Sequence, residues 1–289
     1  MSAALLSIVI LTRDEERNLP ATLASLESLA SPVFVVDSGS GDRTVDIARA
    51  AGCTVVFHEF TTHARQLNWA LENLPITTPW VMRLDADERL TPELAAELLA
   101  KLPSLPAEIT GLMARRRVYF WGRWIRHGGY YPTWLLRIWR HGAAVCEDRD
   151  MDEHMLIRHG RIGRLEHDFI DENRKDIGFF IEKHNRYADK EVASLRAPVG
   201  EADAGRAGQA VARKRFLKDR LYGRSPRFLR AFLYWAFRYF IQLGFLDGRP
   251  GFVFHFLQGF WYRVVVDAKL TESEIPTKRP NAPPQPKAP

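Results

Sequence analysis

Short apolar runs alternate with amphipathic segments over the first hundred residues. Four runs rich in β-branched and apolar residues predict strands buried in a sheet, at 7–11, 33–36, 54–57 and 80–84. Leucines and alanines at helical spacing predict helices between them, at about 18–29, 42–51 and 64–74, and after them at 92–102. Repeated strand–helix units of this length predict an α/β fold with a mostly parallel sheet and right-handed crossovers.

Polar turns follow three of these predicted strands. They are Thr12-Arg13-Asp14-Glu15, the stretch Asp37-Ser-Gly-Ser-Gly-Asp42, and Asp85-Ala86-Asp87. Ligands of open α/β sheets bind at the carboxyl ends of the strands. Two carboxylates at such an edge favour a divalent cation that carries a phosphate ester, since Mg and Mn take oxygen ligands. The alternative is a solvated acidic loop that only precedes the helix begun by Thr91-Pro92.

The glycine pattern excludes two common nucleotide-binding classes. No G-x-G-x-x-G follows the first predicted strand, and no P-loop lysine is present. The chain is therefore expected to be neither a standard dinucleotide-binding protein nor a P-loop enzyme.

The composition of the chain changes after residue 102. The segments 115–121 and 124–139 are aromatic and basic, which predicts irregular strands and loops over the carboxyl edge of the sheet. The densest acidic cluster follows at 146–154, and then come His167-Asp168 and the basic stretch Lys183-His-Asn-Arg-Tyr187. A basic helix there either is solvated or holds an acceptor phosphate beside the site.

Basic and aromatic residues dominate the C-terminal part. The formal net charge is +6, and eight Lys or Arg residues with one acid lie between Arg213 and Arg230. On a helical period the segment 228–246 places one set of polar residues on a single face, namely Arg227, Arg230, Tyr234, Arg238 and Gln242. Two central arginines disfavour a membrane-spanning helix and favour one that lies in the membrane interface. The alternatives are packing on the N-terminal α/β domain or a homo-oligomer interface.

The remaining features concern the compartment and the ends of the chain. Cys53 and Cys146 have no metal-ligand spacing, which predicts reduced thiols in a cytoplasmic protein. The expected interfacial helix adds a peripheral location on the inner face of the membrane. The N-terminus predicts a first strand rather than a signal peptide. Residues 276–289, rich in Pro, Lys and Ala, are expected to be a disordered tail.

Three motifs in order then add up to a family resemblance. The Thr12–Glu15 turn after the first strand, V-V-D-S-G-S-x-D-x-T at 35–44 and L-D-A-D-E at 84–88 together resemble a family 2 glycosyltransferase of the GT-A fold, over about residues 5–190. The later M-D-E-H at 151–154 and K-H-N-R-Y-A at 183–188 resemble a bacterial subgroup that makes cell-surface polysaccharide or lipopolysaccharide.

This resemblance implies a division of the chain. Residues 1–195 would form the GT-A catalytic domain, with a nucleotide-sugar half at about 1–102 and an acceptor half at about 103–195. Residues 196–275 would form a helical region for membrane association or oligomerisation.

The resemblance also implies roles for individual residues. The nucleotide-sugar site would comprise Thr12, Arg13, Glu15, Asp37 as partner of the base, and Asp85 with Ala86. Asp87 would ligate Mn or Mg, with His167 as a further ligand. The catalytic base would be Glu153, with Asp152 and Asp148 as rivals. Aromatic residues between Tyr119 and Trp134 would stack on sugars, helped by Arg137 or Arg140 on phosphate.

The implied activity is inverting, metal-dependent transfer of a sugar from a nucleotide diphosphate sugar to a hydroxyl of a lipid-linked or cell-envelope glycan. A UDP-sugar is favoured over a GDP-sugar. Two alternatives are a sugar nucleotidyltransferase and a nucleic-acid-binding protein. The first would want a Gly-rich basic loop after the first strand, which Thr12–Glu15 does not provide. The second is disfavoured because the aromatic residues of the basic region lie in helical stripes, and no nucleic-acid partner is expected.

Overall fold

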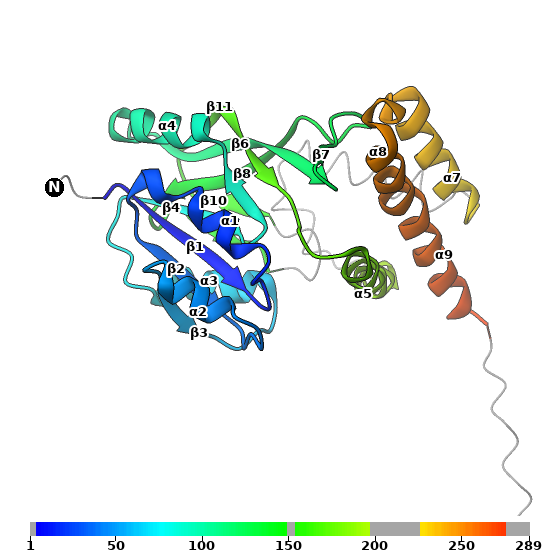
Figure 1. The fold of residues 1–289 in the computed structure, drawn as a ribbon, viewed down its shortest axis with the longest axis horizontal. Coiled ribbons are helices and arrows are strands. Elements are labelled where there is room, and N and C mark those ends of the chain that lie inside the picture. Colours follow the sequence, from blue (N-terminus) through cyan, green and yellow to red (C-terminus); the bar gives the residue numbers. More distant parts are fainter. Residues whose placement is uncertain (1–3, 149–153, 197–225, 276–289) are drawn as a thin grey trace, which may run out of the picture.

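The computed structural model describes residues 4–148, 154–196 and 226–275. One mixed sheet organises the N-terminal part, with strand order β3-β2-β1-β4-β8-β6-β11-β5 and β7 paired to β6 (Figure 1). The strands are β1 (Leu6–Thr12), β2 (Val33–Asp37), β3 (Thr54–Phe57), β4 (Trp80–Asp85), β5 (Glu88–Leu90), β6 (Ile109–Phe120), β7 (Arg123–Trp124), β8 (Thr133–Arg140) and β11 (Arg161–Asp171), with β9 (Ala144–Cys146) and β10 (Met155–Ile157) forming a separate ribbon.

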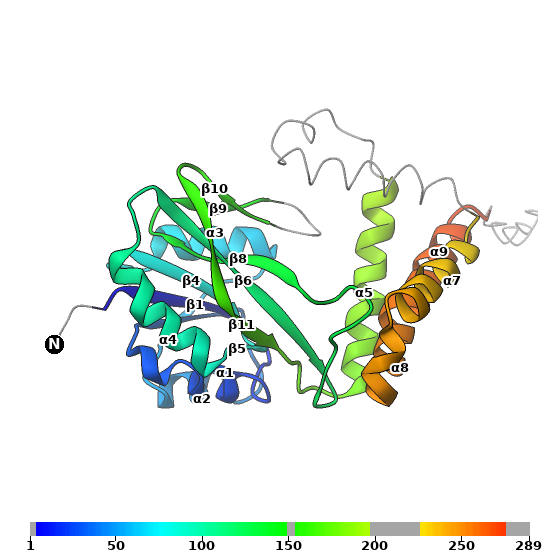
Figure 2. The ribbon, with the colours of Figure 1, turned by 90° about the horizontal axis from the view of Figure 1, so that it is seen from above.

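Helices flank this sheet and form a second body beside it (Figures 1 and 2). The α-helices are α1 (Leu19–Ala24), α2 (Thr44–Ala50), α3 (His63–Asn73), α4 (Pro92–Lys101), α5 (Ile177–Arg196), α7 (Leu229–Ala236), α8 (Gly248–His255) and α9 (Tyr262–Glu272). Three short segments are 3-10 helices, namely η1 (Glu27–Leu29), η2 (Leu102–Ser104) and η5 (Gly244–Asp247). Two are π-helical, namely η4 (Phe237–Ile241) and η6 (Phe256–Trp261).

The predicted parallel strands are confirmed. β1 pairs in parallel with β2 and with β4, and β2 pairs in parallel with β3. Alternate β1 side chains enter two cores, since Ile8 and Ile10 pack with leucines of α1 and α4 while Val9 packs with α3. A strand buried on both faces needs apolar residues at every position, which is why this run does not alternate.

The aromatic and basic segment after residue 102 differs from the prediction. Only part of it forms loops, at 125–132 between β7 and β8; β6 and β8 extend the sheet itself, with β8 antiparallel to both β4 and β6. The basic run at 115–117 obeys strand alternation. Arg115 and Arg117 both contact Asp168, whereas Arg116 points to the other face and contacts Asp171.

The C-terminal helices pack on α5, and α8 also contacts the end of β6 through Phe254 and Phe120. Ala188 and Val192 of α5 share a buried cluster with Tyr262 and Val266 of α9. The chain reverses earlier than predicted: η5 follows Leu243, and the helix resumes at Gly248 and runs through α8, η6 and α9. The predicted break at 247–251 is therefore wrong by about one helical turn.

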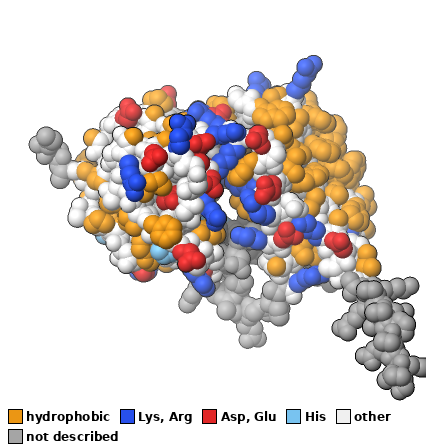
Figure 3. Space-filling model, turned by 60° about the horizontal axis from the view of Figure 1, so that its bottom comes forward, with side chains coloured by type: hydrophobic (Ala, Val, Ile, Leu, Met, Phe, Trp, Pro, Cys, Tyr) orange, Lys and Arg blue, Asp and Glu red, His pale blue; other side chains and the backbone are white. Residues whose placement is uncertain are grey.

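The amphipathic segment at 228–246 is oriented opposite to a helix on the surface of a soluble protein, which would turn its polar face to water. Its predicted polar face is turned into the protein: Arg230, only 9% exposed, pairs with the fully buried Asp267, and Arg238 lies over the Tyr130 ring at 3.8 Å. The apolar face is left outward, and Figure 3 shows a broad hydrophobic surface over these helices. Within the described ranges, no helix combines the length and apolar character that crossing a bilayer requires.

Candidate active site

Three polar strand ends meet at the carboxyl edge of the sheet. β1, β2 and β4 are neighbours, and their register places Thr12 beside Asp37 and Leu11 beside Asp85. The sequence prediction that Thr12, Asp37 and Asp85 gather at one edge is met by this arrangement. Such an edge is the usual ligand site of an open α/β sheet.

Asp37 organises the turn that follows β2. Its carboxylate accepts hydrogen bonds from the Thr12 hydroxyl at 3.0 Å, from the backbone amides of Gly39 and Ser40 at 2.9 Å, and from the Ser40 hydroxyl. Gly39 has a positive φ of 91°, which only glycine adopts without strain. Recognition of a base by Asp37 stays a prediction, because these contacts already give its carboxylate a structural role.

Glu15 links the first turn to the segment before α5. It accepts hydrogen bonds from the Lys175 ammonium and the Asn18 amide, both at 2.7 Å. Burial raises the pKa of Glu15, and its neighbours Lys175 and Asn18 offset only part of that rise. Arg13, by contrast, is exposed.

Asp85 lies between two arginines at the end of β4. Arg83 reaches its Oδ1 and Arg137 its Oδ2, at 3.2 and 3.1 Å, and Arg137 also contacts the buried Glu88. Burial raises the pKa of Asp85, but the charges of Arg83 and Arg137 outweigh it and hold the pKa well below its usual range. Asp85 is therefore a firmly ionised carboxylate whose charge is already balanced by protein cations.

Two further residues of this turn have separate roles. Ala86 is buried, and its carbonyl accepts a hydrogen bond from Thr22 at 2.7 Å, which fixes the loop backbone. His63 sits with Nε2 at 3.2 Å from Arg83, and burial followed by the Arg83 charge lowers its pKa to about 4. Among the described residues its buried Nδ1 has no hydrogen-bond partner, and its Nε2 lies 3.9 Å from Asp85 Oδ1. The sequence offered no motif that singles out His63.

Asp87 lies beside a carboxylate that the sequence analysis missed. The Asn173 amide donates to Asp87 Oδ2 at 3.0 Å, and the amide of Glu172 donates to the Asp87 carbonyl. Asp171, at the end of β11, is close enough that burial and the charge of Asp87 raise its pKa to about 6. The available signal was weak: Asp171 ends an apolar run at Phe169-Ile170, much as Asp85 ends β4.

His167 is not brought to Asp87. Its Nδ1 contacts Glu97 of α4 at 2.9 Å, and its backbone amide donates to the same carboxylate. It also precedes Asp171 by four residues along β11, which corresponds to roughly 13 Å in an extended strand. The pairing of His167 with Asp87 around one metal is therefore corrected to a structural role at the α4 surface.

The acids proposed as catalytic base divide into two groups. Glu153 and Asp152 lie outside the described residues. Asp148 is described and pairs with Arg65 of α3, with Nε 3.1 Å from Oδ2 and both side chains more than half exposed. The choice of Glu153 therefore stays a prediction.

Arg137 and Arg140, the two arginines expected on phosphate, lie in the middle and at the end of β8. Arg137 reaches Asp85 at the carboxyl edge. Arg140 pairs in register with Trp80 at the amino end of β4, where it donates to the carbonyls of Ile109 and Leu105. The expectation for Arg140 is wrong because antiparallel pairing carries it to the far edge of the sheet.

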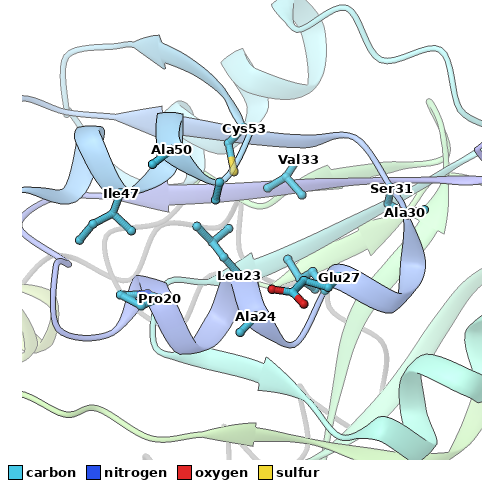
Figure 4. Close-up of a pocket in the computed structure, with 12 residues that line it drawn as sticks. Pro20, Leu23, Ala24, Glu27, Ala30, Ser31, Val33, Ile47, Ala50 and Cys53 are labelled. Carbon is cyan, nitrogen blue, oxygen red and sulfur yellow. The ribbon is translucent and has the colours of Figure 1, made fainter.

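A separate hollow lies away from these residues (Figure 4). It is lined by α1, α2 and the start of β2, and among its lining residues Glu27 alone is charged. Leu23, Ile47 and Cys53 give it an apolar floor. It opens at the amino end of β2, so it contributes nothing to the acidic edge.

Comparison with known proteins identifies the class to which this fold and site belong. The model of glycosyl transferase family 2 matches residues 7–167, which is more than half of the chain. The chain therefore belongs to glycosyltransferase family 2, and the predicted family and GT-A type of fold are confirmed. This assignment decides against a sugar nucleotidyltransferase and against a nucleic-acid-binding protein.

Among individual proteins, the chain is 30% identical over 208 residues to the lipopolysaccharide core biosynthesis glycosyltransferase LpsC of Rhizobium meliloti (strain 1021). This alignment covers 67% of this chain and 74% of LpsC. The chain is 33% identical over 93 residues to an uncharacterised glycosyltransferase of Rickettsia typhi, covering 32% of this chain and 31% of that one.

Solved structures give partial likenesses. S. aureus TarS superposes with a TM-score of 0.40 at 17% identity, over 68% of this chain and 41% of that chain. Glucosyl-3-phosphoglycerate synthase of Mycobacterium tuberculosis, in complex with Mn²⁺, UDP and glucosyl-3-phosphoglycerate, gives 0.33 at 21% identity, over 39% of this chain and 44% of that chain.

Proposed function

We propose that this glycosyltransferase is inverting and metal-dependent, and that it moves a sugar from a nucleotide diphosphate sugar, with UDP favoured, to a hydroxyl of a lipid-linked cell-envelope glycan. The observation that carries the proposal is that Asp87 and Asp171 line the same cavity at the carboxyl edge, where Asp171 pairs in register with Glu88, the residue after Asp87. The name of the relative LpsC supports a lipopolysaccharide acceptor.

The donor set fits a hard divalent cation. Among the described residues, no group of three or more His, Cys, Asp or Glu side chains forms a closed metal site. Mg is usually held by one or two carboxylates together with substrate phosphates, and Asp87 and Asp171 offer two carboxylates that line one cavity. Asp171 thus replaces His167 as the second proposed ligand. Mn or Mg bound there would neutralise charge on the leaving diphosphate.

The chain's own residues perform the other tasks. Asp85, Arg83 and Arg137 fix the loop that carries Asp87. Asp37 and Thr12 hold the neighbouring strand ends at which we place the nucleoside. Glu153 is the proposed base, which accepts the proton of the acceptor hydroxyl as that oxygen attacks the sugar carbon from the face opposite the diphosphate. Such a displacement inverts the configuration of the carbon.

Donor binding tests the activity. UDP-sugars should stabilise the protein against heat in the presence of Mn, by about 2.7 kcal/mol at a hundredfold excess over Kd. The measurement is a thermal-shift panel of UDP-, GDP- and other nucleotide sugars, each with Mn and with chelator. If no nucleotide raises the melting temperature in either condition, the proposed donor site is wrong.

We further propose that the outward apolar face of the C-terminal helices docks on the cytoplasmic side of an anionic membrane. The face consists of exposed large side chains, among them Phe228, Leu229, Phe232, Leu233, Phe237, Phe240, Ile241, Leu243, Phe245 and Leu246 (Figure 3). Patches of this kind on a monomer mark interaction sites. The basic run at 213–224 lies just before it in the sequence, and each Lys or Arg near an anionic surface contributes about 1 kcal/mol.

Vesicle flotation tests this membrane proposal. The protein should float with phosphatidylglycerol-containing vesicles at low salt, and Ile241→Glu should weaken binding about tenfold or more, because burial of one such side chain contributes about 1.5–3 kcal/mol. Ile241 is 71% exposed, and the matched control is Phe57→Glu on β3, where Phe57 is 68% exposed. Flotation that is absent at both low and high salt, or equal loss in both variants, would overturn the proposal. A dimer that Ile241→Glu dissociates would assign the face to self-association.

A further inference from the structure

A cavity of about 220 Å³ opens beside Asp87, on the side away from the nucleoside edge. One wall consists of the ends of β6 and β11, and the other consists of α5 with residues of α8 and η6, including Phe254 and Gln258. The strand ends that carry Thr12 and Asp37 lie on the opposite side of β4, since the strand order is β2-β1-β4-β8-β6-β11. The cavity therefore lies where an acceptor would approach a donor held at the β1–β2 edge.

Lys183 is a cation of this cavity that the described residues contact only through aromatic rings. Its ammonium lies 6.0 Å from the Phe179 ring and 5.9 Å from the Tyr187 ring, and within the described residues it forms no hydrogen bond or ion pair. Burial lowers the pKa of Lys183, but Tyr187 and then Asp87 and Asp171 raise it further, so the net pKa is above its usual range. A half-buried, fully charged ammonium without an acceptor is costly unless a ligand supplies one.

Arg116 lines the same cavity, and its side chain is 30% exposed. Its Nη1 lies 3.3 Å from Asp171 Oδ2, and among the described residues its guanidinium donates no hydrogen bond. The other lysine of the cavity, Lys175, is already paired with Glu15 at 2.7 Å. Arg116 and Lys183 are therefore the two groups that remain available to an incoming anion.

The acids on the walls must be considered as well. Asp87, Asp171 and Asp176 line the cavity together with Arg116, Lys175 and Lys183. Asp176 lies 3.5 Å from Arg17, and a divalent cation on Asp87 and Asp171, as proposed above, would offset their charge. What remains is a cationic pair among the aromatic side chains of Tyr119, Trp121 and Tyr187, which are suited to the apolar face of a sugar.

We infer that this cavity is an acceptor subsite for a sugar that carries a phosphate or carboxylate group, with Lys183 and Arg116 binding that anion. The inference rests on the proposed function, because it presupposes a donor held at Asp87. Lys183 and Arg116 then determine which acceptors are used: an anionic sugar supplies hydrogen-bond acceptors to the Lys183 ammonium and to the half-exposed Arg116 guanidinium, and a neutral sugar supplies no charge to either.

The experiment measures binding of small sugars to the full-length protein saturated with UDP and Mn. Glucose 6-phosphate and glucuronate probe the phosphate and the carboxylate, with glucose as the neutral reference, by calorimetry. At least one anionic sugar should bind about 10- to 100-fold more tightly than glucose, the range of a charge-assisted hydrogen bond. Lys183→Met should remove that preference, Lys183→Arg should restore part of it, and Lys190→Met, at an exposed lysine of the same helix, should leave it intact.

The outcomes separate this inference from the proposed function. If UDP binds the wild type with Mn but neither anionic sugar is preferred over glucose, the subsite is wrong and the donor site stands. If Lys183→Met weakens UDP itself by a similar factor, Lys183 serves the donor diphosphate, and the inference is overturned. If UDP does not bind the wild type at all, the failure lies in the proposed function.

Discussion

Replacing Asp87 by Asn should reduce kcat about 10²- to 10³-fold and abolish the effect of Mn on UDP binding. The size follows from electrostatic stabilisation of charge that develops on the leaving diphosphate, where loss of one well-placed group has this effect. The side chain is partly exposed and its neighbour Asn173 can still hydrogen bond to an amide oxygen, so the fold should be retained. The measurement is steady-state turnover with UDP thermal shifts, each over a range of Mn concentrations.

The matched comparison uses the two rival second ligands. Asp171→Asn should weaken the response to Mn, because Asp171 lies beside Asp87. His167→Ala should leave it unchanged, because its imidazole is engaged with Glu97 on the α4 surface and is 45% exposed. A His167→Ala variant that loses the Mn response, while Asp171→Asn keeps it, would contradict this ligand set.

The donor half of the site was accessible to sequence reasoning because its signals are local. Each buried strand reads as a continuous apolar run, and the polar residue that ends the run marks the sheet edge, as with Thr12, Asp37 and Asp85. Parallel pairing of neighbouring strands then brings these ends together without further information. The family motifs fall on the same turns.

The insertion of β8 into the sheet was not predictable in the same way. Its Arg137 is buried, which a sequence pattern reads as a position facing solvent. The burial is possible because Asp85 and Glu88 from another part of the chain compensate the charge. Such pairing across about fifty residues has no periodic signature.

The orientation of the C-terminal helices also depends on a contact between residues far apart in the sequence. The helical period correctly grouped Arg230 and Arg238 on one face, but a helical-wheel projection does not show which residues pack against that face. Asp267, 37 residues after Arg230, makes it an inward face, and the apolar side becomes the surface. Asp171 was missed for a related reason, since only the parallel pairing of β11 with β6 and its antiparallel pairing with β5 bring it to Asp87.

Replacing Glu153 by Gln should lower kcat about 10²- to 10⁴-fold, the usual contribution of a general base, while the affinity for UDP stays the same. The amide keeps the size of the side chain and cannot accept the proton. Asp148→Asn is the matched control in the same acidic cluster. Its pair with Arg65 is largely exposed, and such pairs contribute about 0–1 kcal/mol, so turnover should change little. Asp152→Asn completes the series and distinguishes the two adjacent acids.

The pH dependence of these variants decides between Glu153 and Asp171, a further carboxylate of the site, as the catalytic base. Asp171 has a pKa raised to about 6 by burial and by Asp87, so as a base it would be ionised above pH 6, and turnover would fall as the pH drops through that value. If Asp171 only helps to hold the cation, raising the Mn concentration should recover activity on the acid side, because metal and proton compete for the same carboxylate. A fall near pH 6 that Mn does not relieve, together with an active Glu153→Gln variant, would transfer the role of base to Asp171.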